Sequence, residues 1–155
     1  MKSILTMASY ISSRYEKEYG EPVEEMKLHK LLYIAQRECM IQRNQPLFPE
    51  EFEGWRFGPV APMIRDVYRD QSFPAVAEAD MAEYREVLDY VFENFAAMDS
   101  FALTRLTQGE ICWRKSRKCV LPTATGAITI PNSDILLDAV RIRDRREKWK
   151  LSGMI

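Results

Sequence analysis

The stretch KLHKLLYIAQ at residues 27–36 predicts a helix, because its apolar side chains recur at three- and four-residue steps. We expect this helix to run from about Pro22 to Gln42. Glu24 and Glu25 would lie in its first turn, where negative charge favours the helix dipole. The apolar stripe consists of Met26, Leu28, Leu31, Leu32, Ala35 and Cys39. A stripe this broad is typical of a helix that packs deeply into a core.

An earlier helix is predicted over residues 3–18, where Ile4, Met7, Ala8, Ile11 and Tyr15 share one face. Gly20 and Pro22 follow, which are residues that end one helix and begin the next. The N-terminal unit should therefore be a hairpin of two helices.

The following segment, residues 43–62, is rich in proline and glycine and includes EGWRFGPVAP at residues 53–62. Trp55 and Phe57 alternate with Arg56, as they would in a short strand over residues 53–57. Gly58 and Pro59 predict a turn in which the backbone can approach a neighbour closely. A short helix should then begin at Pro62 and run to about Arg69.

The rest of the chain predicts helices over about 80–98, 100–107 and 132–150, a basic, turn-rich segment at 114–125, and a strand at 127–130. The fold class is therefore mainly α: a single compact helical domain over residues 1–155, with five to six helices and two or three short β-strands. A small sheet would form where residues 53–57 and 127–130 meet.

Composition excludes several classes of protein. The chain has 155 residues, of which 46% are hydrophobic, so it can build a core and is not disordered. Its longest apolar run, residues 31–35, is far shorter than a membrane span, and its first residues do not read as a signal peptide. Three cysteines, an odd number, favour a reducing compartment. We therefore expect a cytoplasmic protein with no membrane partner.

The net charge of −1 conceals an uneven distribution. Residues 1–100 carry a net charge of −7, whereas residues 101–155 carry +6. Such a split indicates either pairing between the two halves or a surface for a charged partner. Pairing within the molecule is the more ordinary interpretation.

The sequence gives little support for a catalytic site or a metal site. His29 and the three cysteines could form a zinc set in principle, but no Cys-x-x-Cys pair is present. His29 steps away from the apolar stripe, which predicts a surface or rim position, and nothing beside it suggests a nucleophile or an orienting acid. No phosphate-binding loop occurs. We expect no catalytic residue, no metal and no cofactor, although an enzyme whose site the sequence does not display stays an alternative.

Nucleic-acid binding is the main alternative function. Four basic residues lie at 114–118 beside Trp113, and six more lie at 141–150, among them Arg143 and Arg146. Basic patches of this kind can neutralise phosphates. Their structural alternative is a face that pairs with the acidic helix near residues 78–93, or a solvated helix end. No complete helix-turn-helix pattern accompanies them.

Three blocks carry a resemblance to a known family. They are Lys-Leu-x-Lys-Leu-Leu-Tyr at 27–33, Pro-Leu-Phe at 46–48 and Glu-x-Trp-x-x-Gly-Pro-Val at 53–60. A weaker block, LTRLTQ at 103–108, is followed by Trp113. Together they resemble the Panacea-domain family, the SocA-type antitoxins related to phage-associated GepA proteins, over roughly residues 5–145.

Four positions depart from the family's pattern, among them Gly54 in place of a frequent Ala and Phe57 in place of a frequent Tyr. Gln108 stands where members often carry His, and His29 stands where Gln is common. The change at Gln108 argues against a catalytic base or a required metal ligand there and leaves a hydrogen-bonding or capping role.

The resemblance implies an antitoxin that binds and neutralises a co-encoded toxin protein, in one branch as an adaptor that delivers the toxin to the ClpXP protease. Aromatic and arginine side chains together are typical of interface hot spots. Their structural alternative is a role in the core or in anchoring the loop, whereas we expect Lys30 and Arg56 to be exposed. The candidate partner-binding residues are Lys30, Tyr33, Trp55, Arg56, Phe57, Gly58, Pro59, Trp113, Arg143 and Arg146.

Overall fold

The computed structural model describes residues 1–124 and 128–153 of the chain. Within them the fold is mainly α, as predicted, with a small three-stranded sheet. The elements in chain order are α1 (Ile4–Tyr19), α2 (Glu25–Arg43), β1 (Phe52–Trp55), β2 (Gly58–Val60), α3 (Pro62–Asp70), the 3₁₀ helix η1 (Glu78–Tyr84), α4 (Arg85–Asn94), α5 (Ser100–Gln108), α6 (Ile111–Ser116), β3 (Ile128–Ile130) and α7 (Asn132–Leu151).

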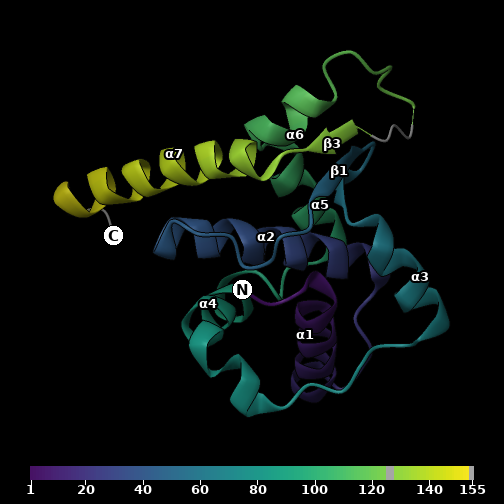
Figure 1. Cartoon of the computed structure of the whole chain (residues 1–155). Coiled ribbons are helices and arrows are strands. Elements are labelled where there is room, and N and C mark those ends of the chain that lie inside the picture. Colours follow the sequence, from purple (N-terminus) through teal and green to yellow (C-terminus); the bar gives the residue numbers. More distant parts are fainter. Residues whose placement is uncertain (125–127, 154–155) are drawn as a thin grey trace.

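Helix α2 is the centre of the molecule, with α7 along one side and α1 and α4 along the other (Figure 1). Fifteen of its 19 residues are buried, including charged ones. A helix buried on every side is stabilised by its neighbours rather than by its own amphipathic face. The structure therefore confirms the helix predicted over this stretch and places it at the centre of the fold. It also corrects one detail, because Met26, which we placed in the buried stripe, is 42% exposed.

The helical hairpin at the N-terminus is confirmed. The Ser3 side chain caps α1 by accepting a hydrogen bond from the Thr6 N–H, at 3.1 Å. At its other end Gly20 adopts φ 75°, a left-handed conformation that glycine reaches without a steric cost, and donates to the carbonyl of Glu16. The chain then turns back so that α1 packs against α2.

The sheet has the strand order β2-β1-β3, and both pairings are antiparallel. Gly54 of β1 lies opposite Ile128 of β3, so the predicted meeting of the two segments is confirmed. Ala127, which we expected to begin that strand, lies outside the described residues. The expected turn at Gly58 and Pro59 is wrong: these residues form β2, and the chain reverses at Arg56 and Phe57.

Two helical segments differ from expectation. The helix predicted over 80–98 begins as η1, becomes α4 only at Arg85 and ends at Asn94. Part of the segment predicted as basic turns is helical, since α6 reaches Ser116. The N-terminus of α6 is held by a residue of α7, because the Asp138 carboxylate accepts a hydrogen bond from the Cys112 N–H at 2.8 Å. A contact across 26 residues of sequence leaves no local signal in the segment that it stabilises.

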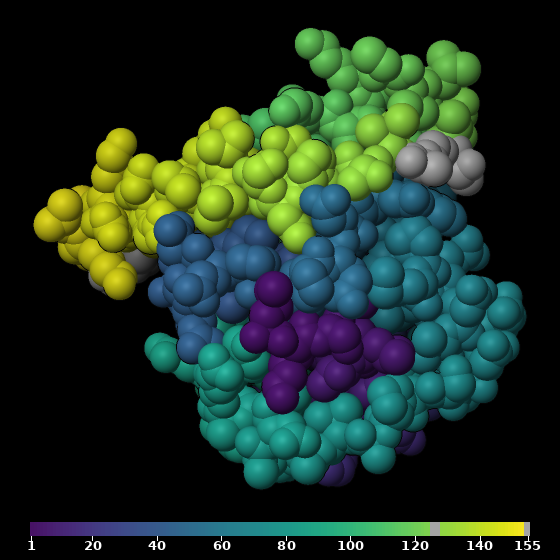
Figure 2. Space-filling model, viewed as in Figure 1, coloured from purple at the N-terminus to yellow at the C-terminus, as the bar shows by residue number. Residues whose placement is uncertain are grey.

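A chain of buried ion pairs joins α2 to α6 and α7. Glu38, which is fully buried, accepts two hydrogen bonds from the Arg146 guanidinium, at 2.8 and 3.0 Å, and lies 3.2 Å from Arg37. Arg37 in turn forms an ion pair with Glu110 at the start of α6. The C-terminal end of α7 continues past this contact and projects from the body of the molecule (Figure 2).

The charge split is paired only partly within the molecule. Arg146 of the basic half reaches Glu38 of the acidic half, as internal pairing requires. The acidic segment over 78–93 does not pair with the basic half in the described residues, because its ion pairs are Asp89 with Arg14, Glu83 with Arg43, and Glu78 with Arg85. Among the described helices, none combines the length and the apolar character needed to cross a membrane.

Candidate partner-binding site

The β1–β2 hairpin carries most of the candidate residues and is held from behind by α5 and α6. The Trp113 indole N–H donates to the carbonyl of Trp55 at 2.8 Å. The Gln108 side chain donates to the carbonyl of Arg56 at 3.1 Å, which confirms its expected hydrogen-bonding role. Both hydrogen bonds hold the backbone of the turn in place. The hairpin therefore presents the side chains of Arg56 and Phe57 from a fixed backbone.

Glycine is required at the first residue of β2, directly after the turn of this hairpin. Gly58 adopts φ 111°, and a Cβ atom there would lie 2.8 Å from the Thr107 hydroxyl and 2.9 Å from Cε of Lys30. A side chain at this position would therefore be both strained and crowded. The expectation that the backbone approaches a neighbour closely at Gly58 is confirmed, and the neighbours are α5 and α2.

Lys30 lies beneath the hairpin and is 1% exposed, so the expectation that it would be exposed is wrong. Strand β2 crosses α2 and covers it. Its ammonium group donates to the carbonyl of Pro59 at 3.1 Å, the one hydrogen bond found for it among the described residues. Burial lowers the pKa of Lys30 to about 8, against an opposing effect from Glu25.

His29 is also buried, at 2% exposed, which overturns the predicted surface or rim position. Its Nδ1 accepts a hydrogen bond from the Ala61 N–H at 3.2 Å, so the proton lies on Nε2, which donates to Glu25 at 3.1 Å. Burial lowers the pKa of His29 to about 4. The neutral ring therefore serves to fix the backbone that leads into α3.

A largely apolar groove of about 310 Å³ opens between the hairpin, α2 and α3. Phe57 is 50% exposed and Met26 42% exposed at its edge. The guanidinium of Arg65 lies 5.0 Å from the Trp55 ring centroid, and that of Arg56 lies 4.9 Å from the Phe57 ring centroid. The lining residues are Glu25, Met26, His29, Lys30, Trp55, Arg56, Phe57, Val60 and Arg65.

Comparison with known families decides the relationship. The family described as "Antitoxin SocA-like, Panacea domain" matches residues 28–114, more than half of the chain. The chain belongs to the SocA-like antitoxin family. The matched range contains the hairpin and every groove residue except Glu25 and Met26.

One curated relative is the Antitoxin SocA of Caulobacter vibrioides. It is 40% identical over 43 residues, which cover 28% of this chain and 23% of that protein. The chain therefore matches about a quarter of the length of this SocA antitoxin. No solved structure matches the chain.

Two other aromatic candidates of this SocA-like chain lie behind the groove rather than in it. Tyr33 is fully buried, with its hydroxyl 3.0 Å from the Cys112 sulfur and its ring edge-on to Phe52. Burial raises the pKa of the Tyr33 phenol, which stays neutral. Trp113 is half-buried and anchors the hairpin. The alternative interpretation, a core or loop-anchoring role, fits the placement of both residues.

The two arginine candidates of the last helix lie on the α2–α7 contact, apart from the groove. Arg146 binds Glu38, as described above, and also lies 5.2 Å from the Tyr90 ring centroid. Arg143 reaches the carbonyl of Ile41 at 3.4 Å. The structure thus brings together Lys30, Trp55, Arg56 and Phe57 along the groove, with Gly58 and Pro59 in the strand beside it, and does not bring Tyr33, Trp113, Arg143 or Arg146 there.

Five groove residues were missed by sequence reasoning, namely Glu25, Met26, His29, Val60 and Arg65. Met26 and Val60 looked like ordinary core residues. Arg65 lies on the first turn of α3, whose packing angle no local pattern specifies. Glu25 could have been found from its four-residue spacing to His29, which places the two side chains in contact.

Thiol and metal chemistry gain no support from the geometry. Cys39 and Cys112 are buried, and burial raises the pKa of both thiols, that of Cys39 to about 11. In residues 1–124 and 128–153, no three His, Cys, Asp or Glu side chains are grouped so that they could hold a metal ion.

Proposed function

We propose that this protein is a cytoplasmic antitoxin that neutralises a co-encoded toxin by direct binding, without catalysis, and that residues 1–155 act as one domain. The observation that carries the proposal is the groove around Phe57, whose backbone is fixed from behind and whose aromatic edge is exposed. Family membership supports the antitoxin role.

The groove has the composition of a binding hot spot. Trp55 and Phe57 supply large apolar surfaces, and Arg56 and Arg65 lie against them. Aromatic and arginine side chains dominate the free energy of many protein interfaces. Since the hairpin is already ordered, binding would cost little conformational entropy.

Lys30 supports a more specific prediction about the toxin. Its buried ammonium has three N–H donors, of which one is used by Pro59. A toxin that inserts a carboxylate or a backbone carbonyl into the groove would satisfy another donor away from water. We therefore expect the toxin to present an apolar side chain beside an acidic or carbonyl group.

The test uses the product of the neighbouring reading frame, co-expressed with this chain. We expect rescue of growth and a complex that copurifies. Phe57→Ala should weaken binding by more than 10-fold, whereas Phe101→Ala, at an exposed phenylalanine on α5, serves as the matched control and should bind normally. If the natural chain neither rescues nor binds, the antitoxin role is wrong; if both variants bind normally, the groove assignment is wrong.

Neutralisation could proceed by blocking the toxin or by its delivery to the ClpXP protease. The two modes predict different toxin lifetimes. An adaptor shortens the half-life of the toxin in cells that contain ClpX and not in cells that lack it. A blocking antitoxin protects both kinds of cell and leaves the half-life unchanged.

Nucleic-acid binding is the second candidate function, because basic residues of α6 and α7 are exposed, among them Arg114, Arg145 and Lys148. Duplex binding should weaken steeply with added salt and should be abolished by reversing the charge of Arg145 and Lys148. Arg146 is a poor choice for this test, since its reversal would break the ion pair with Glu38. Binding that the double reversal leaves unchanged would exclude this surface.

A further inference from the structure

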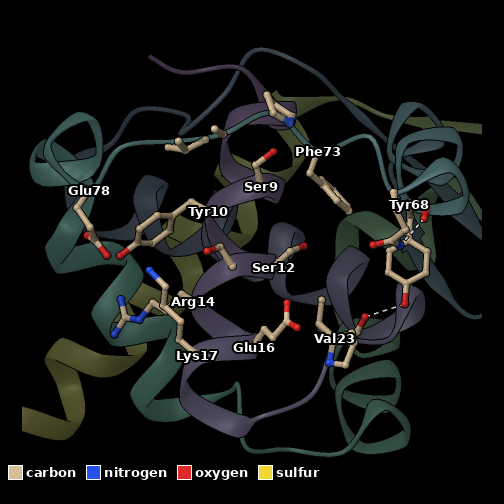
Figure 3. A pocket seen from close by; sticks show the side chains of 16 residues that line it. Ser9, Tyr10, Ser12, Arg14, Glu16, Lys17, Val23, Tyr68, Phe73 and Glu78 are labelled. Atoms are coloured by element: carbon tan, nitrogen blue, oxygen red, sulfur yellow. Dashed lines mark hydrogen bonds between the residues drawn. The ribbon is translucent and has the colours of Figure 1, made fainter.

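A second cavity, of about 460 Å³, lies between α1 and the segment from Tyr68 to Glu78. It shares no lining residue with the groove at the hairpin. Figure 3 shows α1 along one wall, with Tyr68, Phe73 and Val23 on the opposite side. The antitoxin role proposed above makes no use of it.

Two serine hydroxyls in this cavity have no hydrogen-bond partner. The Oγ atoms of Ser9 and Ser12 are buried and unpaired among the described residues, and Ser9 as a whole is 5% exposed. Figure 3 shows both hydroxyls pointing from α1 toward the side closed by Phe73. Buried hydroxyls are nearly always paired, because an unpaired one costs free energy. Two of them one helical turn apart leave hydroxyls that a group from outside the chain, a water or a ligand, can pair.

The wall that faces these hydroxyls is apolar and held in place. The Tyr68 hydroxyl donates to the carbonyl of Val23 at 2.7 Å, and the Tyr68 ring packs edge-on against Phe73 at 6.4 Å between centroids. Val23 is 2% exposed. This wall suits a flat ring that would lie against Phe73 with its polar edge toward α1.

The charges around the cavity select the polar group of the ligand. Arg14 is already paired with Glu18 and Asp89, and Glu78 is paired with Arg85. Glu16, one turn beyond Ser12, has no ion pair among the described residues.

Figure 3 shows the Glu16 carboxylate on the same side as the two serine hydroxyls, with Lys17 toward the far end beside Arg14 and Tyr10. The hydroxyl end of the cavity is therefore acidic, with three acceptors for N–H donors.

We propose that this cavity binds a small aromatic cation, an amine or amidine on a flat ring. Its N–H groups donate to the hydroxyl oxygens of Ser9 and Ser12 and to the carboxylate of Glu16, and its ring lies against Phe73 and Val23. The protein would then have a small-molecule binding site that is separate from the proposed protein-binding groove.

The test is a titration of the ¹⁵N-labelled full chain with benzamidine, with benzoate as the probe of equal shape and opposite charge. We expect amide shifts confined to α1 and residues 68–76, with a low-millimolar dissociation constant, roughly what so small a ligand can reach. Benzoate should bind at least 10-fold more weakly. Equal binding of the two probes, or no shift with benzamidine, would overturn the proposal.

Variants locate the contacts. Ser12→Ala and Glu16→Gln should each weaken benzamidine binding at least 5-fold, whereas Ser133→Ala and Glu21→Gln, at exposed positions that do not line the cavity, should change it less than 2-fold. Without ligand, Ser9→Ala should keep or raise the melting temperature, because it removes an unpaired buried hydroxyl. A fall in melting temperature would show that the Ser9 hydroxyl serves the fold and would contradict its role as a free ligand contact.

Discussion

The two ends of α2 bury charged side chains in opposite ways. In its C-terminal half, Arg37 and Glu38 are enclosed with their counter-charges Glu110 and Arg146. In its N-terminal half, Lys30 is as deeply buried and has only a backbone carbonyl as its partner. A buried charge that meets its counter-charge within the chain serves to hold elements together. Lys30 instead supports the backbone of β2, and its remaining donors would meet the toxin only under the proposed function.

The largest effect should come from breaking the matched end. Glu38→Ala leaves the Arg146 guanidinium without its carboxylate and removes one partner of Arg37, so it should lower the free energy of unfolding by roughly 3–5 kcal/mol. Urea denaturation monitored by circular dichroism would measure this loss. Glu83→Ala is the control, because its pair with Arg43 is largely exposed and should be worth under about 0.5 kcal/mol. Similar losses in both variants would mean that the buried ion pair stabilises the fold no more than the exposed one does.

Gly58, at the start of β2, should be the next most sensitive position. Gly58→Ala introduces a Cβ that meets the Thr107 hydroxyl and Lys30, at a positive φ, and should cost roughly 3 kcal/mol. Gly20→Ala also has a positive φ but no atom within 4 Å, so it should cost about 1 kcal/mol. The difference between the two melting temperatures isolates the crowding at the groove. Equal costs would show that the hairpin moves aside.

Much of this sensitivity lies beyond what a sequence can specify. The periodicity at 27–36 predicted α2, and proline and glycine predicted where helices stop. The same periodicity placed His29 at the rim, because it assumes that a helix buries only one face. A helix at the centre of the molecule, such as α2, is buried on all sides. The burial of His29 and Lys30 depends on β2 crossing α2, which is a tertiary contact.

His29, in the N-terminal half of α2, should make the stability of the fold depend on acid pH. The unfolded chain takes up a proton near pH 6.5, whereas the folded chain keeps His29 neutral down to about pH 4, so stability falls as the pH drops between these values. The loss attributable to this group should be roughly 2 kcal/mol.

The His29→Gln variant isolates that contribution. Glutamine can accept from the Ala61 N–H and donate to Glu25, and it does not titrate in this range. The comparison is needed because burial raises the pKa of Glu110, which acts with the opposite sign in acid. Denaturant midpoints at pH 7 and pH 4.5 would measure the effect, and identical pH profiles for both chains would contradict it.

The smallest effect on stability is expected at Lys30. Lys30→Met replaces a desolvated amine by an apolar chain of similar length and should raise the free energy of unfolding by about 1 kcal/mol at pH 7. The natural chain should also gain stability as the pH rises from about 8 toward 10, because the unfolded chain holds the Lys30 proton longer; the variant should not. Destabilisation by Lys30→Met would show that its bond to Pro59 matters more than its burial.

The ion pair between Glu38 and Arg146 also sets an order of events during synthesis. The two residues are 108 positions apart, so the ribosome completes α2 well before α7 exists. At a translation rate of roughly 5–20 residues per second, Arg146 is synthesised on the order of ten seconds after Glu38. During that interval α2 has an uncovered side, and the newly made chain is open to chaperones and proteases. The supply of finished protein therefore depends on how quickly its last helix is translated and docks.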